Sequence, residues 1–461
     1  MMRLAWQPAR ASALRRSLAL AALTLLAASA GAWSNHALCT WQALSVLREF
    51  AGAAPVKVER LETFLAAEAA GLEGLLQQEE QWARKNVPSY PARPDTLAWR
   101  AAPAPPAELG QRFRAALRIN PEARLTLFLQ LPPGQGADGR PTLPWTEVTT
   151  LKRHAVTQAI TFLALREGEL APVVDVIASA SDEPDYGLDI GLWEDNGTSQ
   201  GKAYGLGKQA FGNPALEFSS QGPMHIGYYH EAAIVYKAAP FLQRTYPEYR
   251  IHLYQSLAAY ALRTGHPYWG WRFAGWALHH LQDLTQPYHA RVLPGVTTTR
   301  MLWINLLDLA GFHAAKQSAI TLVSNRHFAI ENYQFNRVRS AYLRRDFDDA
   351  AMRALRDTSR DAANPYVDDS PRRVITQQSH ALADSLDHTL ETRLPAKYIS
   401  DPGYTFGETE SGVDLNALVD KSQPPARDAM TATLTELLSN FGMHTRAFVR
   451  SLIAKAPAAK G

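Results

Sequence analysis

The chain is 461 residues long, and 46% of them are hydrophobic, 20% charged and 10% aromatic, a composition that excludes a disordered or collagen-like protein and supplies a sizeable core. Its single cysteine, Cys39, excludes an intramolecular disulfide and a cysteine-based zinc cage. Any bound metal ion must therefore be held by His, Asp, Glu or main-chain groups, and the chain has 14 histidines.

The first segment, residues 1–32, has the pattern of a cleaved secretory signal peptide. Its four arginines, with no acidic residue, precede an apolar run over residues 18–28 and a small-residue cleavage site at Ala30-Gly31-Ala32. The run is too short to span a bilayer, which needs about 20 residues. We therefore expect an exported chain, periplasmic or extracellular, that begins at Trp33. This mature part carries one more acidic than basic residue, so no stable nucleic-acid binding is expected.

The mature chain, residues 33–461, is predicted to be mainly helical, because apolar residues recur at spacings of three and four. Helices are predicted over 43–50, 56–85, 146–166, 231–284 with breaks at Pro240, Pro247 and Pro267, 301–353, 380–394 and 427–454. Pro and Gly clusters predict loops over 86–144, around a helix at 108–119 and a strand at 125–131, and a long ordered loop over 181–223. Without repeats or linkers, the pattern predicts one compact all-α domain.

Two pairs of His and acidic residues have the spacing of metal ligands on a helix. His279 and Asp283 lie four residues apart, so they share one helical face and can bind one cation. Pro287 is expected to end this helix and to return His289 to the same region. His327 and Glu331 repeat the spacing. A single pair of this kind is more often a solvated helix face, so the prediction depends on the combination.

The combination resembles the zinc-dependent phospholipases C, whose signature is roughly H-Y-x-G-D-x-x-x-P-x-H. Residues 279–289 resemble it, and His327 with Glu331 resembles the His-x-x-x-Glu pair that follows it in this family. Mature chains of the family begin with a tryptophan whose amine and carbonyl bind zinc, as Trp33 would. Pro184-Asp185-Tyr186 resembles the Pro-Asp-Tyr segment that the family carries upstream.

The resemblance implies a site of three zinc ions. It assigns the first ion to Trp33, His36 and Asp283. It assigns the second ion to Asp283, Asp185, His279 and a histidine after Asp185. It assigns the third ion to His289, His327 and Glu331. Both His225 and His230 remain candidates for the histidine after Asp185, and the position of His225 at the end of the loop favours it. Asp185 is also expected to orient or deprotonate the attacking water.

Several features depart from the family. Residues 86–144 are expected to be an insertion, and Gln282 and His280 stand where the signature has glycine and tyrosine. His280 should face away from the ligands and pack in the core. The apolar segment 299–312 is expected to be a core helix, with a lid or a lipid-surface contact as the alternative. The chain after Asn332 lacks the β-sandwich with which the clostridial toxin of the family docks on membranes.

These observations favour a secreted zinc phosphodiesterase. Zinc neutralises phosphate oxygens and lowers the pKa of a bound water towards 7, so we expect a phospholipase C that hydrolyses phospholipid head groups in transient contact with a membrane surface. A single-strand nuclease of the same superfamily is the alternative, although its last pair is His-x-x-x-Asp and this chain has Glu331. A second alternative is a non-enzymatic secreted protein that zinc only stabilises.

Overall fold

The computed structural model describes residues 33, 35–152, 155–212, 217–406 and 412–455. The predicted signal peptide lies outside these residues. The structure is 62% helix and 3% strand, which confirms the all-α prediction. The helices are α2 His36–Leu44, α3 Leu61–Ala67, α4 Ala69–Asn86, α5 Pro106–Leu117, α6 Ala155–Gln158, α7 Val173–Ser181, α8 Ser199–Ala203, α9 Gly222–His225, α10 Ala233–Ala238, α11 Pro247–Thr264, α12 Pro267–Asp283, α13 Thr298–Leu309, α14 Ala314–Leu343, α15 Ala350–Arg356, α16 Thr376–Arg393, α17 Ala396–Ile399, α18 Leu415–Asp420 and α19 Pro424–Lys455.

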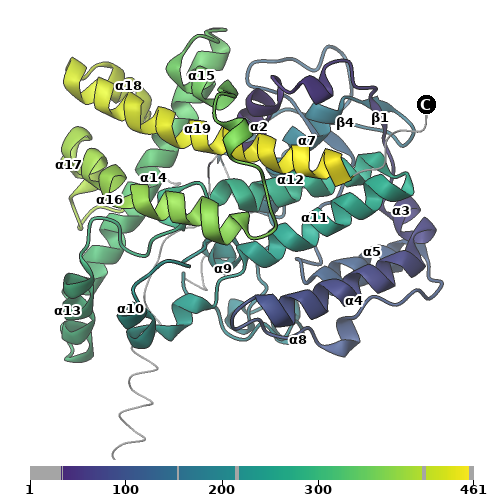
Figure 1. The fold of residues 1–461 in the computed structure, drawn as a ribbon, viewed down its shortest axis with the longest axis horizontal. Helices are drawn as coiled ribbons and strands as arrows, with labels where there is room; N and C mark the ends of the chain where they lie inside the picture. Colours follow the sequence, from purple (N-terminus) through teal and green to yellow (C-terminus); the bar gives the residue numbers. More distant parts are fainter. Residues whose placement is uncertain (1–32, 34, 153–154, 213–216, 407–411, 456–461) are drawn as a thin grey trace, which may run out of the picture.

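The centre of the fold is α12, which packs against α11, α7 and α19 (Figure 1). Proline occupies the first helical position of both α11 and α12, where its missing N–H costs nothing. Gly265 ends α11 in the left-handed conformation, with φ +90°, which glycine adopts without a Cβ clash. The predicted breaks between residues 231 and 284 are therefore confirmed.

The apolar core of the described residues consists of two large clusters and a small third one, and one of the places where the chain crosses between the large clusters lies just after α12. The first cluster contains Trp269, Trp276 and Leu284, and the second contains Tyr288 and Phe441. The predicted metal ligands gather at this crossing. They therefore lie in the interior of the protein, where a charged group must be paired or must bind a metal ion.

Short strands replace helix in one part of the chain. The continuous helix predicted over 146–166 is wrong, because the described part of this stretch contains the short helix α6 and then a strand. This strand, β4 (Phe162–Ala164), is the middle strand of a three-stranded antiparallel sheet between β2 (Phe128–Gln130) and β3 (Thr142–Leu143). A middle strand buried on both faces shows a continuous apolar run instead of alternation, and such a short run resembles a buried helix. The strand predicted at 125–131 is confirmed by β2.

The other differences concern where elements begin. The segment 56–85 opens with β1 (Val56–Lys57), which pairs with β5 (Leu170–Ala171), before α3 and α4. The helix predicted over 43–50 lies earlier in the chain, as α2. The segment 301–353 divides into α13, α14 and α15, and the first break falls at Gly311, whose φ is +93°.

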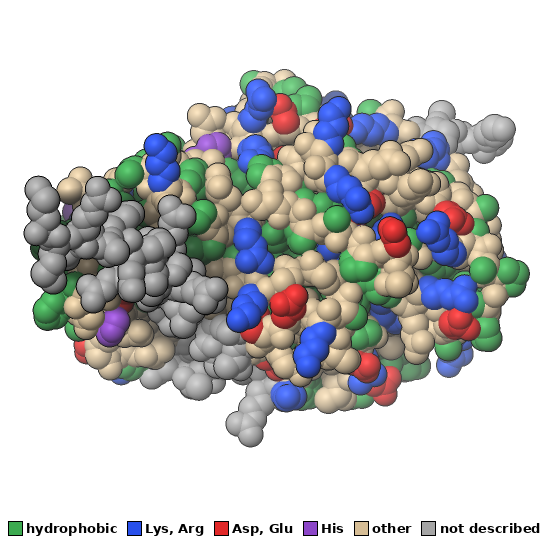
Figure 2. All heavy atoms as spheres, turned by 90° about the horizontal axis from the view of Figure 1, so that it is seen from below, with side chains coloured by type: hydrophobic (Ala, Val, Ile, Leu, Met, Phe, Trp, Pro, Cys, Tyr) green, Lys and Arg blue, Asp and Glu red, His purple; other side chains and the backbone are tan. Residues whose placement is uncertain are grey.

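The described surface mixes charges of both signs. Figure 2 shows Lys and Arg side chains interspersed with Asp and Glu over the right-hand side of one face. This distribution matches the nearly balanced charge of residues 33–461. Among the described residues, no helix is both long and apolar enough to cross a membrane.

Candidate metal centre

The last turn of α12 supplies the first candidate ligands. His279 and Asp283 are completely buried, and His279 Nε2 lies 3.4 Å from Asp283 Oδ2. The prediction that these residues share one helical face is therefore confirmed. The helix ends at Asp283, and the following 3-10 turn, η9 (Pro287–His289), returns the chain towards the same region.

The ring of His279 is oriented by the backbone of α7. Its Nδ1 donates a hydrogen bond to the carbonyl oxygen of Ser181 at 2.8 Å, so in the neutral ring Nε2 carries the lone pair. Burial, with the nearby His36 and His225 rings, lowers the pKa of His279 well below its usual value. A neutral imidazole with a backbone-held N–H is the usual form of a histidine that binds a metal ion.

His36 at the start of α2 approaches the same carboxylate from the other side. Its Nε2 lies 3.3 Å from Asp283 Oδ1, and its Nδ1 contacts Gln282 Oε1 at 2.8 Å. Gln282 is itself fixed, because its amide nitrogen donates to the hydroxyls of Thr40 at 2.7 Å and Thr445 at 3.0 Å. Although burial lowers it, the hydrogen bond and charge of Asp283 raise the pKa of His36 to about 9.

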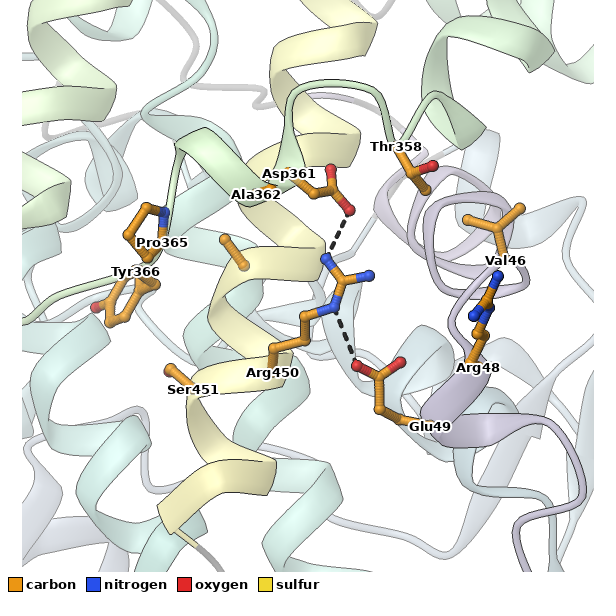
Figure 3. A pocket seen from close by; sticks show the side chains of 11 residues that line it. Val46, Arg48, Glu49, Thr358, Asp361, Ala362, Pro365, Tyr366, Arg450 and Ser451 are labelled. Atoms are coloured by element: carbon orange, nitrogen blue, oxygen red, sulfur yellow. Dashed lines mark hydrogen bonds and ion pairs between the residues drawn. The ribbon is translucent and has the colours of Figure 1, made fainter.

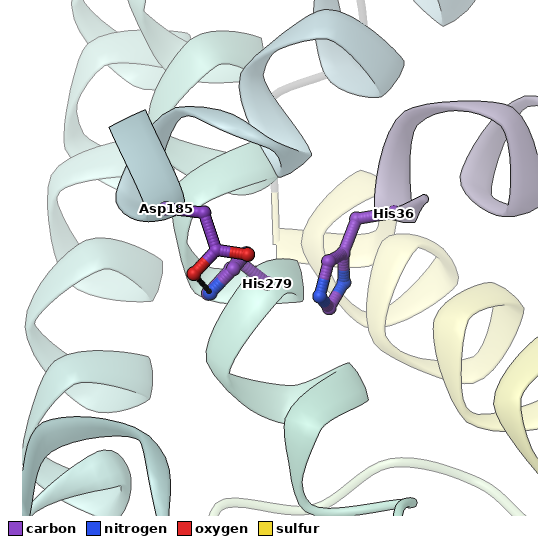
Figure 4. A group of neighbouring side chains, drawn as sticks. All are labelled: His36, Asp185 and His279. Atoms are coloured by element: carbon purple, nitrogen blue, oxygen red, sulfur yellow. Dashed lines mark ion pairs between the residues drawn. The ribbon is translucent and has the colours of Figure 1, made fainter. Parts of the chain in front are cut away.

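Asp185 completes a group with His36 and His279, in which the three side chains converge from three different elements (Figure 4). Asp185 Oδ1 lies 3.7 Å from His279 Nε2. Asp185 belongs to the 3-10 turn η5 (Glu183–Tyr186), which is fixed to α12 by two hydrogen bonds between Glu183 and Arg272, at 2.7 and 2.9 Å. Burial raises the pKa of Asp185 to about 8.

Asp283 lies at the middle of the cluster. Its Oδ1 faces His36, whereas its Oδ2 faces His279 and lies 2.9 Å from Nδ1 of His225. Burial would raise the pKa of Asp283, but the three surrounding histidines lower it well below its usual range. A carboxylate whose two oxygens face different rings has the arrangement of a ligand that bridges two ions.

The second candidate group joins η9 to the middle of α14. His289 Nε2 lies 3.1 Å from His327 Nε2, which lies 2.7 Å from Glu331 Oε1. His289 Nδ1 donates to the carbonyl oxygen of His225 at 3.1 Å, and burial lowers the pKa of His289 to about 3. The backbone of His225 thus connects the two groups.

The described residues fit a metal ion on two counts. Several sets of three buried side chains place their ligand atoms within 4.8 Å of one another, and the sets are His36, Asp185 and His279; His225, His279 and Asp283; Asp189, His225 and His280; and His289, His327 and Glu331. In addition, His36 Nε2, Asp185 Oδ1 and Asp283 Oδ1 are buried, and their only described polar neighbours are other candidate ligands. Buried polar atoms without partners are costly, and a cation held among them removes that cost.

Trp33 lies beside the cluster without belonging to any of these sets. Its indole Nε1 donates to Thr285 Oγ1 at 3.1 Å, and its ring contacts Phe441. The same Phe441 ring lies 6.3 Å from that of His36, measured between centroids. The carbonyl oxygen of Trp33 accepts a hydrogen bond from the backbone N–H of Asn35 at 2.8 Å. Chelation by a freed Trp33 amine stays a prediction.

The structure separates the two histidines that the sequence left as alternatives. His225 is almost completely buried against Asp283 and His279. His230 points elsewhere, and its Nε2 contacts the carbonyl oxygen of Arg372 at 2.8 Å and Thr376 Oγ1 at 3.1 Å. Only His225 is brought together with the other candidate ligands.

The sequence prediction missed Asp189 and assigned His280 to packing alone. Both residues are completely buried, and Asp189 Oδ2 lies 3.4 Å from His225 Nε2 and 3.7 Å from His280 Nε2. Arg250 Nη2 lies 2.5 Å from the other oxygen of Asp189 and already neutralises it. This set is therefore better suited to orient His225 than to hold a cation of its own.

A large surface cavity lies apart from this cluster. Its volume is about 740 Å³, and its lining includes Arg450, whose guanidinium contacts both Glu49 and Asp361 (Figure 3). These charges compensate one another, and none of the candidate metal ligands lines the cavity. The cavity is therefore not assigned to the metal centre.

Comparison with known proteins gives no family assignment. No family model, no curated protein and no solved structure matches the chain.

Proposed function

We propose that the chain is an exported zinc-dependent phosphodiesterase of the phospholipase C type. The observation that carries the proposal is the position of Asp283. Its two oxygens face His36 on one side and His225 and His279 on the other. The His289 group lies directly behind, connected through the backbone of His225. Such a cluster provides imidazole and carboxylate ligands for more than one ion within a single buried region.

The ligand sets follow the resemblance to zinc-dependent phospholipases C. Asp283 would bridge a first ion, held with His36 and the freed terminal amine and carbonyl of Trp33, and a second ion. The second ion would be completed by His279, His225 and Asp185, and a third would be held by His289, His327 and Glu331. The chain thus offers nitrogen and oxygen donors, which suit zinc.

Zinc bound there would neutralise phosphate oxygens, supply a water of lowered pKa and stabilise the leaving alkoxide. The side chains of the protein would orient the attacking water and transfer protons. Asp185 is the most exposed of the central ligands, with 9% of its surface accessible, whereas His36, His279 and Asp283 are completely buried. Its carboxylate therefore lies at the edge of the buried group, where it is placed to accept a proton from the attacking water.

Asp283→Asn tests the proposal, with Asp175→Asn as a matched control. Asparagine keeps the shape of Asp283 but removes the shared negative charge, so we expect loss of zinc and of phosphodiester hydrolysis. Asp175 lies on α7 outside the cluster, and an amide oxygen there still accepts the hydrogen bond from Trp41 Nε1. Metal content is measured by mass spectrometry on the secreted chain, after its N-terminus has been sequenced.

The substrate is tested with choline and ethanolamine phospholipids in detergent micelles and with single-stranded DNA. Cleavage of the phospholipids, abolished by chelator and by Asp283→Asn, supports the proposal. Cleavage of DNA alone replaces it by the nuclease function. Bound zinc without hydrolysis of any substrate assigns the metal a stabilising role. Full zinc content and turnover in Asp283→Asn would refute the ligand set.

A further inference from the structure

The helix α13 presents large apolar side chains to solvent. Trp303, Leu306 and Leu309 recur at every third position and expose 58%, 56% and 48% of their surface, and Phe312, just after the helix, exposes 66%. The prediction of a core helix over 299–312 therefore holds only for the opposite side, where Met301 and Ile304 are buried. Trp303, Leu306, Leu309 and Phe312 together form the α13 face.

The exposed ionisable side chains that flank the α13 face in the chain are basic residue types. Asp308 is the only carboxylate of α13, and it is turned inward, where it contacts Lys316 at 2.7 Å and His313 at 2.6 Å. The exposed ionisable groups nearest the face in the chain are Arg300 at one end of the helix and His313 at the other. An apolar stripe flanked by basic groups is complementary to an anionic or zwitterionic phospholipid surface.

The α13 face lies at one end of the molecule. Figure 1 shows α13 and α10 beside each other at the lower left, and the two helices are in contact. Ile234 of α10 exposes 48% of its surface and Lys237 is also exposed, so the neighbouring helix adds an apolar and a basic side chain. Figure 2, which views the molecule from below the orientation of Figure 1, also shows hydrophobic side chains at the surface on its left-hand side.

The position of α13 in the chain links this surface to the metal centre. The segment that contains α13 connects His289 of η9 to His327 of α14, which are ligands of the same proposed ion. At 12 residues, α13 is about 18 Å long, too short to cross a hydrocarbon core of about 30 Å. A helix of this length with one exposed apolar face can lie along a lipid surface.

We propose that the α13 face docks the protein on the surface of a phospholipid bilayer. The inference rests on the proposed function, because a phospholipase C finds its substrate packed in such a surface. Trp303 and Phe312 would enter the boundary between head groups and acyl chains. Arg300 and Lys237 would remain among the phosphates.

Leu306→Ser combined with Leu309→Ser tests the proposal. Both side chains are exposed, so their replacement should not disturb folding. The control is Val367→Ser with Leu418→Ser, two exposed apolar residues outside the α13 face, at 53% and 38%. Co-sedimentation with vesicles of phosphatidylcholine and phosphatidylglycerol measures binding of the full secreted chain. We expect binding by the wild type and the control, and at least about tenfold weaker binding by the α13 variant, since keeping even one leucine out of lipid has that effect.

Hydrolysis separates docking from chemistry. The α13 variant is expected to hydrolyse a short-chain phosphatidylcholine below its micelle concentration as the wild type does, and to lose activity on vesicles. If no phospholipid is hydrolysed, the proposed function fails, but the loss of vesicle binding still supports docking. Equal vesicle binding by variant and wild type overturns the docking proposal. The docking proposal is also overturned if the wild type does not bind vesicles but forms a dimer that the α13 variant cannot form. The α13 face would then bind a second copy of the chain.

Discussion

Replacement of Gln282 by leucine should weaken zinc binding without touching a proposed ligand. Gln282 stands where the family signature has glycine, and its amide oxygen accepts from His36 while its amide nitrogen donates to Thr40 and Thr445. Leucine has a similar size but none of these groups. His36 would then lose the hydrogen bond that directs its Nε2 at Asp283. Loss of such a supporting bond typically lowers metal affinity by about 10 to 100-fold.

The cost in stability follows from the partners left unpaired. A buried imidazole N–H without an acceptor costs about 1–3 kcal/mol. Each of the two threonine hydroxyls loses one hydrogen bond that it accepts from Gln282, at about 0.5–1 kcal/mol. Gln282→Leu is therefore expected to lower the free energy of unfolding by about 3 kcal/mol. Gln282→Glu keeps an acceptor for all three partners and should preserve zinc binding.

Competition with a zinc chelator measures the affinity, and guanidinium unfolding measures stability. Gln255→Leu is the matched control, because Gln255 is also buried, on α11, but its side chain contacts Tyr366 instead of a candidate ligand. The control should lose stability and keep its affinity for zinc. A folded Gln282→Leu variant that binds zinc as tightly as the wild type would refute the role of Gln282.

Three further predictions concern other parts of the structure. His225→Ala should lose zinc, whereas His230→Ala, whose ring faces backbone and hydroxyl oxygens, should keep it, and metal analysis of both variants decides. Arg250→Met leaves the buried carboxylate of Asp189 without its counter-charge and should cost about 3–5 kcal/mol in guanidinium unfolding. Burial opposes the ionised form of Asp308, but hydrogen bonds from its basic neighbours lower its pKa. The ionised carboxylate therefore stabilises the fold above about pH 4, and this stabilisation is lost as the pH falls through the pKa of the folded state. The difference in melting temperature between wild type and Asp308→Asn should accordingly shrink in acid, and a constant difference would contradict this assignment.

The parts of the fold that depend on local sequence could be predicted. Proline at the first position of α11 and α12 and glycine between them set those helix ends, and the four-residue spacing of His279 and Asp283 set their common face. β4 could not be predicted, because a strand between two others depends on partners distant in the chain.

The contacts around the candidate ligands also could not be predicted from local sequence patterns. The sequence identified Gln282 only as a departure from a signature, since its role depends on α2 and α19, which lie far from it in the chain. His280 was assigned to packing because the helical pattern turns it away from His279. The structure instead places His280 against Asp189, whose approach no periodicity encodes.

The connections of α2 have a consequence for the order of folding. The hydrogen bond from His36 to Gln282 joins residues 246 positions apart, and the bond from Trp33 to Thr285 joins residues 252 positions apart. Closing such long loops is entropically costly, and contacts of this range form slowly. We expect α2, although it is synthesised before the helices that hold it, to be among the last segments fixed in place.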